Sequence, residues 1–334
     1  MSGLVGHTAY AVLTQETLRQ RRPRLAELLR KHWHTYLSAA YIGCDIQTLP
    51  EAICVDTGEE VGYGTIPLER SPLTGGLLRP WSLQFADSRF TPRQIHTLFY
   101  GRSHLVFGWS TEQQQHLVPW DHLPDFAAAA LQDVFEHFSG SESAVAWICG
   151  WLVHIVGDSL IKSVRPGLQM TLLDGLYTPR NRPVQDLYTF HEVGIGEFGL
   201  NWPELFAGMS RAAQEPVQYH VLRCARPRGN LAAQFSNAWE PAQEQLLEAV
   251  CRENRRYLGI YAERLLKSYA LRTIDGEQQC AQELSAAAGG LTWAEMRSAA
   301  QQARFREVLS TIAAEAATMV ERSLEGTPAT RGLR

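Results

Sequence analysis

The residues best placed to do chemistry lie at the end of one apolar stretch, which runs from Ala144 to Val156 and continues to a carboxylate at Asp158. As a helix, this stretch is hydrophobic almost all round, which is typical of a buried helix. His154 and Asp158 are four residues apart, so their side chains lie on one face, one turn apart. An imidazole and a carboxylate at that spacing can bind one metal ion or two adjacent ones. The alternative is a hydrogen-bonded pair that ties down a core helix.

Three more histidine or aspartate residues fall where predicted helices meet. His7 lies near the start of the chain, Asp45 follows a helix end made of small residues, and His104 lies on a helix. Taken one at a time, a histidine on a helix or an aspartate at a helix end usually has a structural role. Nitrogen and carboxylate ligands without thiolates suit Zn²⁺, Fe²⁺ or Mn²⁺.

The elements that would position these residues are predicted to be helices. The segment from Thr8 to Leu29 is amphipathic and is interrupted by Pro23, which breaks or restarts a helix. Thr91 opens a capping box with proline at the first helical position, and the helix after it carries His104. Between these helices, residues 47–90 show little periodicity, so we expect a long irregular excursion.

The remainder of the chain is also predicted to be helical. An alanine-rich helix begins at Asp125, Ser141 caps the central apolar helix, and two long helices span Glu240–Leu271 and Thr292–Leu324. No segment alternates as a strand does over several residues. We therefore expect an all-α fold, with a single multi-helix domain over residues 1–326 and a flexible tail over residues 327–334.

Composition limits the classes of protein that fit. The chain has 334 residues, 45% of them hydrophobic and 20% charged, which is enough to bury a sizeable core. The net charge is −4 and no block of Lys and Arg interleaved with aromatic residues occurs, so we do not expect duplex nucleic acid as a partner. The six cysteines are scattered, and we see no secretory signal and no apolar run of about 20 residues. These features predict a cytoplasmic protein without a transmembrane segment; they do not indicate its oligomeric state.

The order of these residues resembles that of the zinc-dependent phospholipase C and single-strand-specific nuclease superfamily, whose members are all-helical enzymes with a metal cluster. The most specific matching piece is Gly-Trp-x-x-His-x-x-x-Asp, from Gly150 to Asp158. The resemblance spans about residues 7 to 197 and implies a fold of the zinc-dependent phospholipase C type. Carried over, it implies that Asp45, His104 and His154 bind one metal, and that Asp158 bridges to a second metal, which His7 also holds.

The chain also departs from the pattern of that superfamily. No histidine follows the central aspartate within Leu160–Val164, and His191 is followed four residues later by Ile195 where the family has an acid. We therefore expect two divalent ions rather than three, zinc in the first place and iron or manganese as alternatives. His191 is then either a ligand of a remnant site or a general acid or base.

Three functions remain open from the sequence. The first is a metal-dependent, phospholipase C-like hydrolase, in which a metal-bridging hydroxide attacks a phosphoester; Asp158 and His191 are its expected catalytic residues. Arg102, Lys162 and Arg165 could clamp the phosphate of such a substrate, or could be surface charges. The second is a di-iron or other oxidative or lyase enzyme acting on a cytosolic small molecule with the same scaffold. The third is a non-catalytic helical binding protein.

Overall fold

A computed structural model describes residues 3–46, 48–62, 69–71, 74–107, 115–161, 180–224, 241–325 and 327. Within these ranges the protein is mostly α-helical, which confirms the predicted fold class at this level. The helices are α1 (Leu4–Arg21), α2 (Pro23–Lys31), α3 (Trp33–Ile42), α4 (Pro92–His104), α5 (Leu123–His137), α6 (Glu142–Ile161), α7 (Asn181–Tyr188), α8 (Trp202–Ala212), α9 (Glu215–Cys224), α10 (Pro241–Tyr269), α11 (Gln282–Ala287), α12 (Trp293–Gln302) and α13 (Phe305–Glu325). A 3₁₀ turn, η1 (Trp120–His122), and a π-helical turn, η2 (Thr189–Glu197), complete the helical segments of the described residues.

Local sequence signals set several helix boundaries. Thr91 and Gln94 form the predicted capping box at the start of α4, and Thr292 and Glu295 form another at the start of α12. Pro23 occupies the first turn of α2, where its missing N–H costs no hydrogen bond. The prediction of a single helix from Thr292 to Leu324 is wrong, because the chain forms two helices, α12 and α13. They are separated by a turn at Arg304, whose φ of 52° lies in the left-handed region.

The structure also contains short strands, which the sequence did not predict. β1 (Ala52–Cys54) pairs antiparallel with β2 (Glu60–Val61) and β3 (Leu78–Pro80), with Ala52 opposite Val61 and Pro80. The remaining strands form hairpins: β4 (Leu83–Phe85) with β5 (Ser88–Phe90), β6 (Val106–Phe107) with β7 (Gln115–His116), and β8 (Arg272–Ile274) with β9 (Glu277–Gln279). Each strand has only two or three residues, which is too short for alternation to be visible in the sequence.

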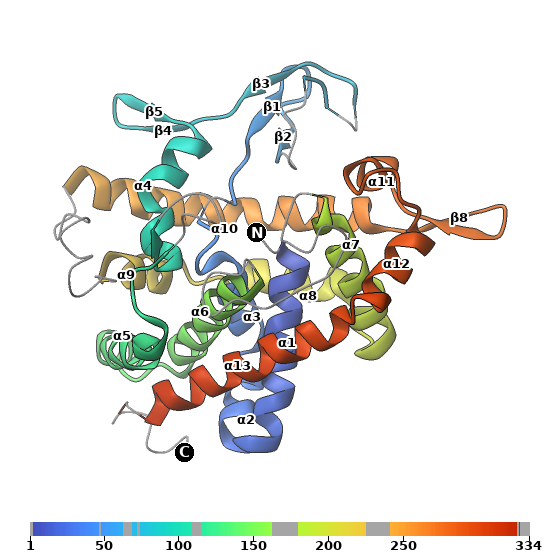
Figure 1. Cartoon of the computed structure of the whole chain (residues 1–334). Helices are drawn as coiled ribbons and strands as arrows, with labels where there is room; N and C mark the ends of the chain where they lie inside the picture. Colours follow the sequence, from blue (N-terminus) through green and yellow to red (C-terminus); the bar gives the residue numbers. More distant parts are fainter. Residues whose placement is uncertain are drawn as a thin grey trace.

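Helix α6 forms the centre of the core. Figure 1 shows α1, α3 and α6 in the middle of the molecule, and α6 packs against α1, α3, α5 and α13. By length and composition α6 could cross a membrane, but its most apolar window is entirely buried inside the protein, as in a core helix. Gly150 lets α6 approach the backbone of α3 closely, because a Cβ at this position would clash with the carbonyl oxygen of Tyr36.

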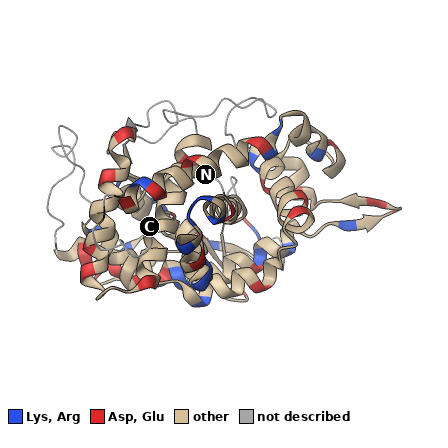
Figure 2. Cartoon of the chain, turned by 90° about the horizontal axis from the view of Figure 1, so that it is seen from below, with Lys and Arg blue, Asp and Glu red and all other residues tan. Residues whose placement is uncertain are grey.

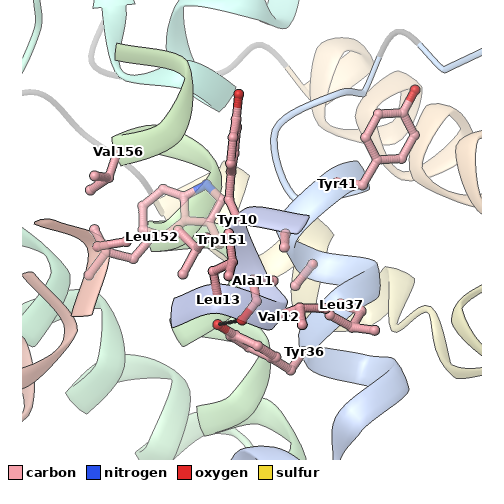
Figure 3. Packing of buried hydrophobic residues seen from close by; sticks show 14 of the residues in the cluster. Tyr10, Ala11, Val12, Leu13, Tyr36, Leu37, Tyr41, Trp151, Leu152 and Val156 are labelled. Atoms are coloured by element: carbon pink, nitrogen blue, oxygen red, sulfur yellow. Dashed lines mark hydrogen bonds between the residues drawn. The ribbon is translucent and has the colours of Figure 1, made fainter. Parts of the chain in front are cut away.

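Aromatic side chains fill the space between the central helices. Tyr36 is buried and its hydroxyl donates to the carbonyl of Ala11, 3.0 Å away, which links α3 to α1 (Figure 3). Trp151 of α6 is completely buried in the same group. In Figure 3 the side chain of Tyr41 lies apart from these residues, and its hydroxyl points away from them. Burying each large side chain of this kind is worth roughly 2–3 kcal/mol.

Charged residues lie on the outer elements. In Figure 2, acidic and basic positions are interspersed along the ribbon, on many of the helices. Thr327, the first residue of the expected tail, is buried; its hydroxyl donates to the carbonyl oxygen of Ser323, 2.8 Å away, and lies 3.3 Å from that of Ala128. The rest of that tail lies outside the described residues.

Candidate metal centre

Five buried side chains converge from four elements, and they are the five metal ligands expected from the sequence. His7 lies on the first turns of α1, and His104 is the last residue of α4. α6 carries His154 and Asp158, and Asp45 lies three residues after the end of α3. Each of the five residues is at most 4% exposed. We call this cluster the α6 centre: His7, Asp45, His104, His154 and Asp158.

Two overlapping groups of ligand atoms share His154: one with His104 and Asp158, the other with His7 and Asp45. Asp45 Oδ1 lies 3.4 Å from His104 Nε2 and 4.0 Å from His154 Nε2. Asp158 Oδ2 lies 3.7 Å from each of these two nitrogens. Ligand atoms bound tetrahedrally to one zinc ion at about 2.0–2.2 Å are roughly 3.3–3.6 Å apart, so these printed pairs need only a small contraction to hold one.

The second oxygen of Asp158 faces another imidazole. Asp158 Oδ1 lies 3.3 Å from His7 Nε2, without the geometry of a hydrogen bond. The ring of His7 stacks on that of His154, with centroids 3.7 Å apart and planes 5° apart. The carboxylate of Asp158 therefore has one oxygen on each side of the cluster, which is the arrangement of a bridging ligand. His7 and Asp158 together supply half of a second site.

Hydrogen bonds behind the imidazoles fix which nitrogen faces the cluster. His154 Nδ1 is 2.9 Å from the carbonyl oxygen of Ala40, which can only accept, so Nδ1 carries the hydrogen. The remaining nitrogen, His154 Nε2, has no hydrogen-bond partner among the described residues and is completely buried. His104 Nδ1 lies 2.8 Å from the Ser103 hydroxyl and 3.2 Å from the carbonyl of Tyr100. Because the Ser103 hydroxyl itself donates to that carbonyl, both neighbours can accept from Nδ1, and the same tautomer is favoured there.

Burial and mutual attraction shift the pKa values in the cluster. Burial, together with the neighbouring His154, lowers the pKa of His7 to about 4, so His7 is neutral near pH 7. Burial alone raises the pKa of Asp45, but attraction to His154, His104 and His7 outweighs it and brings the pKa to about 2. The cluster therefore presents an ionised carboxylate beside buried imidazole nitrogens, among them His154 Nε2, which carries no hydrogen. A divalent cation between them satisfies both kinds of ligand, so the residues fit a metal.

A group of tyrosine, arginine and aspartate side chains lies beside the α6 centre, and the sequence analysis did not predict it. Tyr41 of α3 lies 6.1 Å from the His7 ring and stacks on Tyr261 of α10, with centroids 6.2 Å apart. The Arg182 guanidinium approaches the Tyr261 hydroxyl at 3.5 Å and the Asp186 carboxylate at 3.5 Å. Asp186 also accepts a hydrogen bond of 2.7 Å from Tyr269, and burial raises the pKa of Asp186.

The sequence did contain one signal for this group. Arg182 and Asp186 have the same four-residue spacing as His154 and Asp158 and share one face of α7. A Cβ on Gly3, one turn before His7 on α1, would lie 3.0 Å from Asp186, so this carboxylate lies against the start of the helix that carries His7.

Of the residues expected to clamp phosphate, Arg102 lies within the described ranges. Arg102 is buried on α4, but it is two residues from His104 and so leaves the helix on a different face. Lys162 and Arg165 lie outside the described residues.

The structure does not bring His191 to the cluster. His191 lies in η2, where its Nε2 donates to the carbonyl of Tyr269, 2.8 Å away, and its ring packs on Trp293. Burial lowers the pKa of His191. The predicted role for His191 as ligand or general acid-base residue therefore lacks support from its position, because this hydrogen bond and this packing hold the ring against α10 and α12.

Comparisons with protein-family models, with curated proteins and with solved structures found no match.

Proposed function

We propose that the protein is a metal-dependent hydrolase that acts on a phosphoester and holds two divalent ions in the α6 centre. The observation that carries this proposal is His154. Its Nε2 is completely buried, its tautomer is set by the Ala40 carbonyl, and its lone pair points at two carboxylates. Leaving such a nitrogen without a partner costs about 1–3 kcal/mol, and a bound cation removes that cost.

The residues of the centre have separate tasks in this proposal. Asp45, His104 and His154 hold the first ion with one oxygen of Asp158, and His7 holds the second with the other oxygen. When bound, the ions would activate a water molecule and neutralise charge on the phosphoryl oxygens. The Ala40 and Tyr100 carbonyls keep the two imidazoles oriented while a substrate binds.

The neighbouring polar group supplies a candidate site for the rest of the phosphoryl charge. Arg182 is 30% exposed and is joined to the centre through Tyr261 and Tyr41. A guanidinium beside a dinuclear centre can donate two hydrogen bonds to a phosphoryl group. We assign Arg182 this role; Lys162 and Arg165 lie outside the described residues.

One observation favours a second function, oxidative chemistry at iron. Two tyrosine rings lie against His7, that of Tyr10 at 5.5 Å and that of Tyr41 at 6.1 Å, and tyrosines can transfer electrons to an oxidised metal. Ligands of nitrogen and oxygen suit iron as well as zinc. The metal present after purification separates the two functions: zinc favours hydrolysis, and iron with a visible absorption band favours oxidation.

The proposal is tested by metal content and activity measured on the same variants. His154→Ala and Asp158→Asn should lose the metal of the centre by elemental analysis, and should lose hydrolysis of a chromogenic phosphodiester such as bis(p-nitrophenyl) phosphate. His122→Ala is the matched control, because His122 is 71% exposed in η1. Full metal content in His154→Ala would contradict the assignment of the site. A metal-loaded wild-type protein that leaves phosphoesters intact would contradict the hydrolase function.

A further inference from the structure

A second set of metal ligands lies between α5 and α9, away from the α6 centre. Asp133 and His137 are four residues apart at the end of α5, and His220 and Cys224 are four residues apart at the end of α9. Each pair therefore shares one face of its helix. The two helices pack against each other, and the two pairs meet at the contact.

The ligand atoms of Asp133, His220 and Cys224 lie within 4.8 Å of one another, and the ring of His137 lies beside them. His220 Nε2 lies 2.6 Å from Asp133 Oδ2 and 3.9 Å from Cys224 Sγ. The ring of His137 stacks on that of His220, with centroids 3.9 Å apart and planes 23° apart. Stacked imidazoles also occur in the α6 centre, where His7 lies on His154 in the same way.

We propose that Asp133, His137, His220 and Cys224 form a transition-metal site, selective for zinc, which is independent of the α6 centre. One thiolate, two imidazoles and one carboxylate make a four-coordinate set that suits Zn²⁺. The site ties together the last turns of α5 and α9.

A metal would take the place of the hydrogen bond between His220 and Asp133. The same nitrogen of His220 faces both an oxygen and a sulfur, and one N–H can be directed at only one of them. A zinc ion with bonds of about 2.0–2.3 Å needs its ligand atoms roughly 3.3–3.8 Å apart, which the nitrogen–sulfur distance nearly meets. The nitrogen–oxygen distance must open by less than about 1 Å, and the Asp133 side chain, 51% exposed, has room to move.

The helix ends add attraction for a cation. All four ligands lie in the last turns of their helices, since α5 ends at His137 and α9 ends at Cys224. The C-terminal end of a helix carries a partial negative charge, which is typically worth 0.3–1 kcal/mol to a nearby cation. A cavity of about 430 Å³ lies against the two imidazoles and is lined also by Tyr219, Arg223 and Glu248. Zinc can therefore reach the site from solvent without unfolding the protein.

Cobalt titration tests the site directly, because a thiolate bound to Co²⁺ gives an intense charge-transfer band in the near ultraviolet. The ligands of the α6 centre include no thiolate, so cobalt bound there gives no such band. We expect the band in the wild-type protein and in His154→Ala, and its loss in Cys224→Ser. Cys280→Ser, which removes a half-buried thiol elsewhere, is the matched control and should keep the band.

Two further variants separate ligation from folding. Asp133→Asn and His137→Ala keep the thiol and change exposed side chains, so the fold should survive. Each should weaken cobalt binding at least tenfold, with the band shifted or reduced. A wild-type protein without the band, or a Cys224→Ser variant that keeps it, would overturn the proposal.

Discussion

His154 shows how one residue can be prepared for a metal before the metal arrives. Its Nδ1 is held by a backbone carbonyl of α3, which no side-chain substitution removes, and its Nε2 points at Asp45 and Asp158. The ring cannot rotate to satisfy Nε2 elsewhere without breaking the bond to Ala40. The orientation of this ligand is therefore a property of the packing of α3 on α6.

His191 lies furthest from the role that the sequence predicted for it. Its pKa leads to a prediction about how the stability of the protein depends on pH. Burial lowers its pKa in the folded protein, whereas the unfolded chain titrates near pH 6.5. As pH falls through 6.5, the unfolded state binds a proton that the folded state does not, so the free energy of unfolding should decrease. His191→Gln keeps a donor for the Tyr269 carbonyl and should remove part of this decrease, measured by urea unfolding of metal-free protein at several pH values.

The same variant tests the catalytic role. His191→Gln should keep full metal content and turnover, since the described contacts of His191 are with Tyr269, Phe190 and Trp293 and not with the α6 centre. His122→Gln, on the surface, should change neither stability slope nor turnover. A large loss of turnover with metal retained would restore His191 as a general acid or base.

Among the elements, α6 could be predicted from the sequence and the strands could not. A long apolar run without charges predicts a buried helix, and α6 is one. The capping residues Thr91 and Thr292 also lie where helices begin. Strands of two or three residues carry no measurable period. The four-residue spacing of Arg182 and Asp186 on α7 was a signal that the prediction did not use.

The candidate site was predictable only in part for a related reason. The spacing of His154 and Asp158 follows from helix geometry alone. That His7 and Asp45 lie beside them depends on how α1 and α3 pack on α6, which the order of residues suggested only through resemblance to a family. The position of His191 depends on η2, and a π-helical turn has no hydrophobic period by which to recognise it.

The close approach of α6 to α3 gives a prediction for a single glycine. A Cβ at Gly150 would clash with the Tyr36 carbonyl oxygen and lie 2.9 Å from Ala39 Cβ, so the two helices must separate. We expect Gly150→Ala to lower the free energy of unfolding by about 1–3 kcal/mol, and also to weaken metal binding, because Asp45 follows α3 and His154 lies on α6.

Gly259→Ala is the matched control for that prediction. Gly259 lies inside α10, and a Cβ there would meet only the hydroxyl of Ser210, which can rotate away. This variant should be neutral, or more stable by up to about 1 kcal/mol through helix propensity, with metal affinity unchanged. Equal effects of the two substitutions, measured by denaturant unfolding and metal titration, would contradict the role of the α3–α6 contact.

At the scale of the whole molecule, the α6 centre joins parts of the chain that are far apart in sequence. Its ligands come from α1, the end of α3, α4 and α6, so metal binding needs all four elements in their native positions. The hairpin β8–β9 is fully exposed and contributes nothing to the centre. Metal should therefore stabilise the centre of the molecule and leave this projection unaffected.

Because metal binding requires the native fold, it should stabilise the protein by a predictable amount and in predictable helices. Metal at about 100 times its dissociation constant adds about 2.7 kcal/mol per site, which for 334 residues raises Tm by roughly 4 °C. Measured in the Cys224→Ser background, which removes the proposed α5–α9 site, the shift should decrease in His154→Ala and vanish in Asp158→Asn, because Asp158 is the ligand shared by both ions. Hydrogen exchange should show metal-dependent protection in α1, α3, α4 and α6 and none in β8–β9. A full shift that persists in Asp158→Asn, or protection spread evenly over the chain, would mean that the metal binds somewhere other than these five residues.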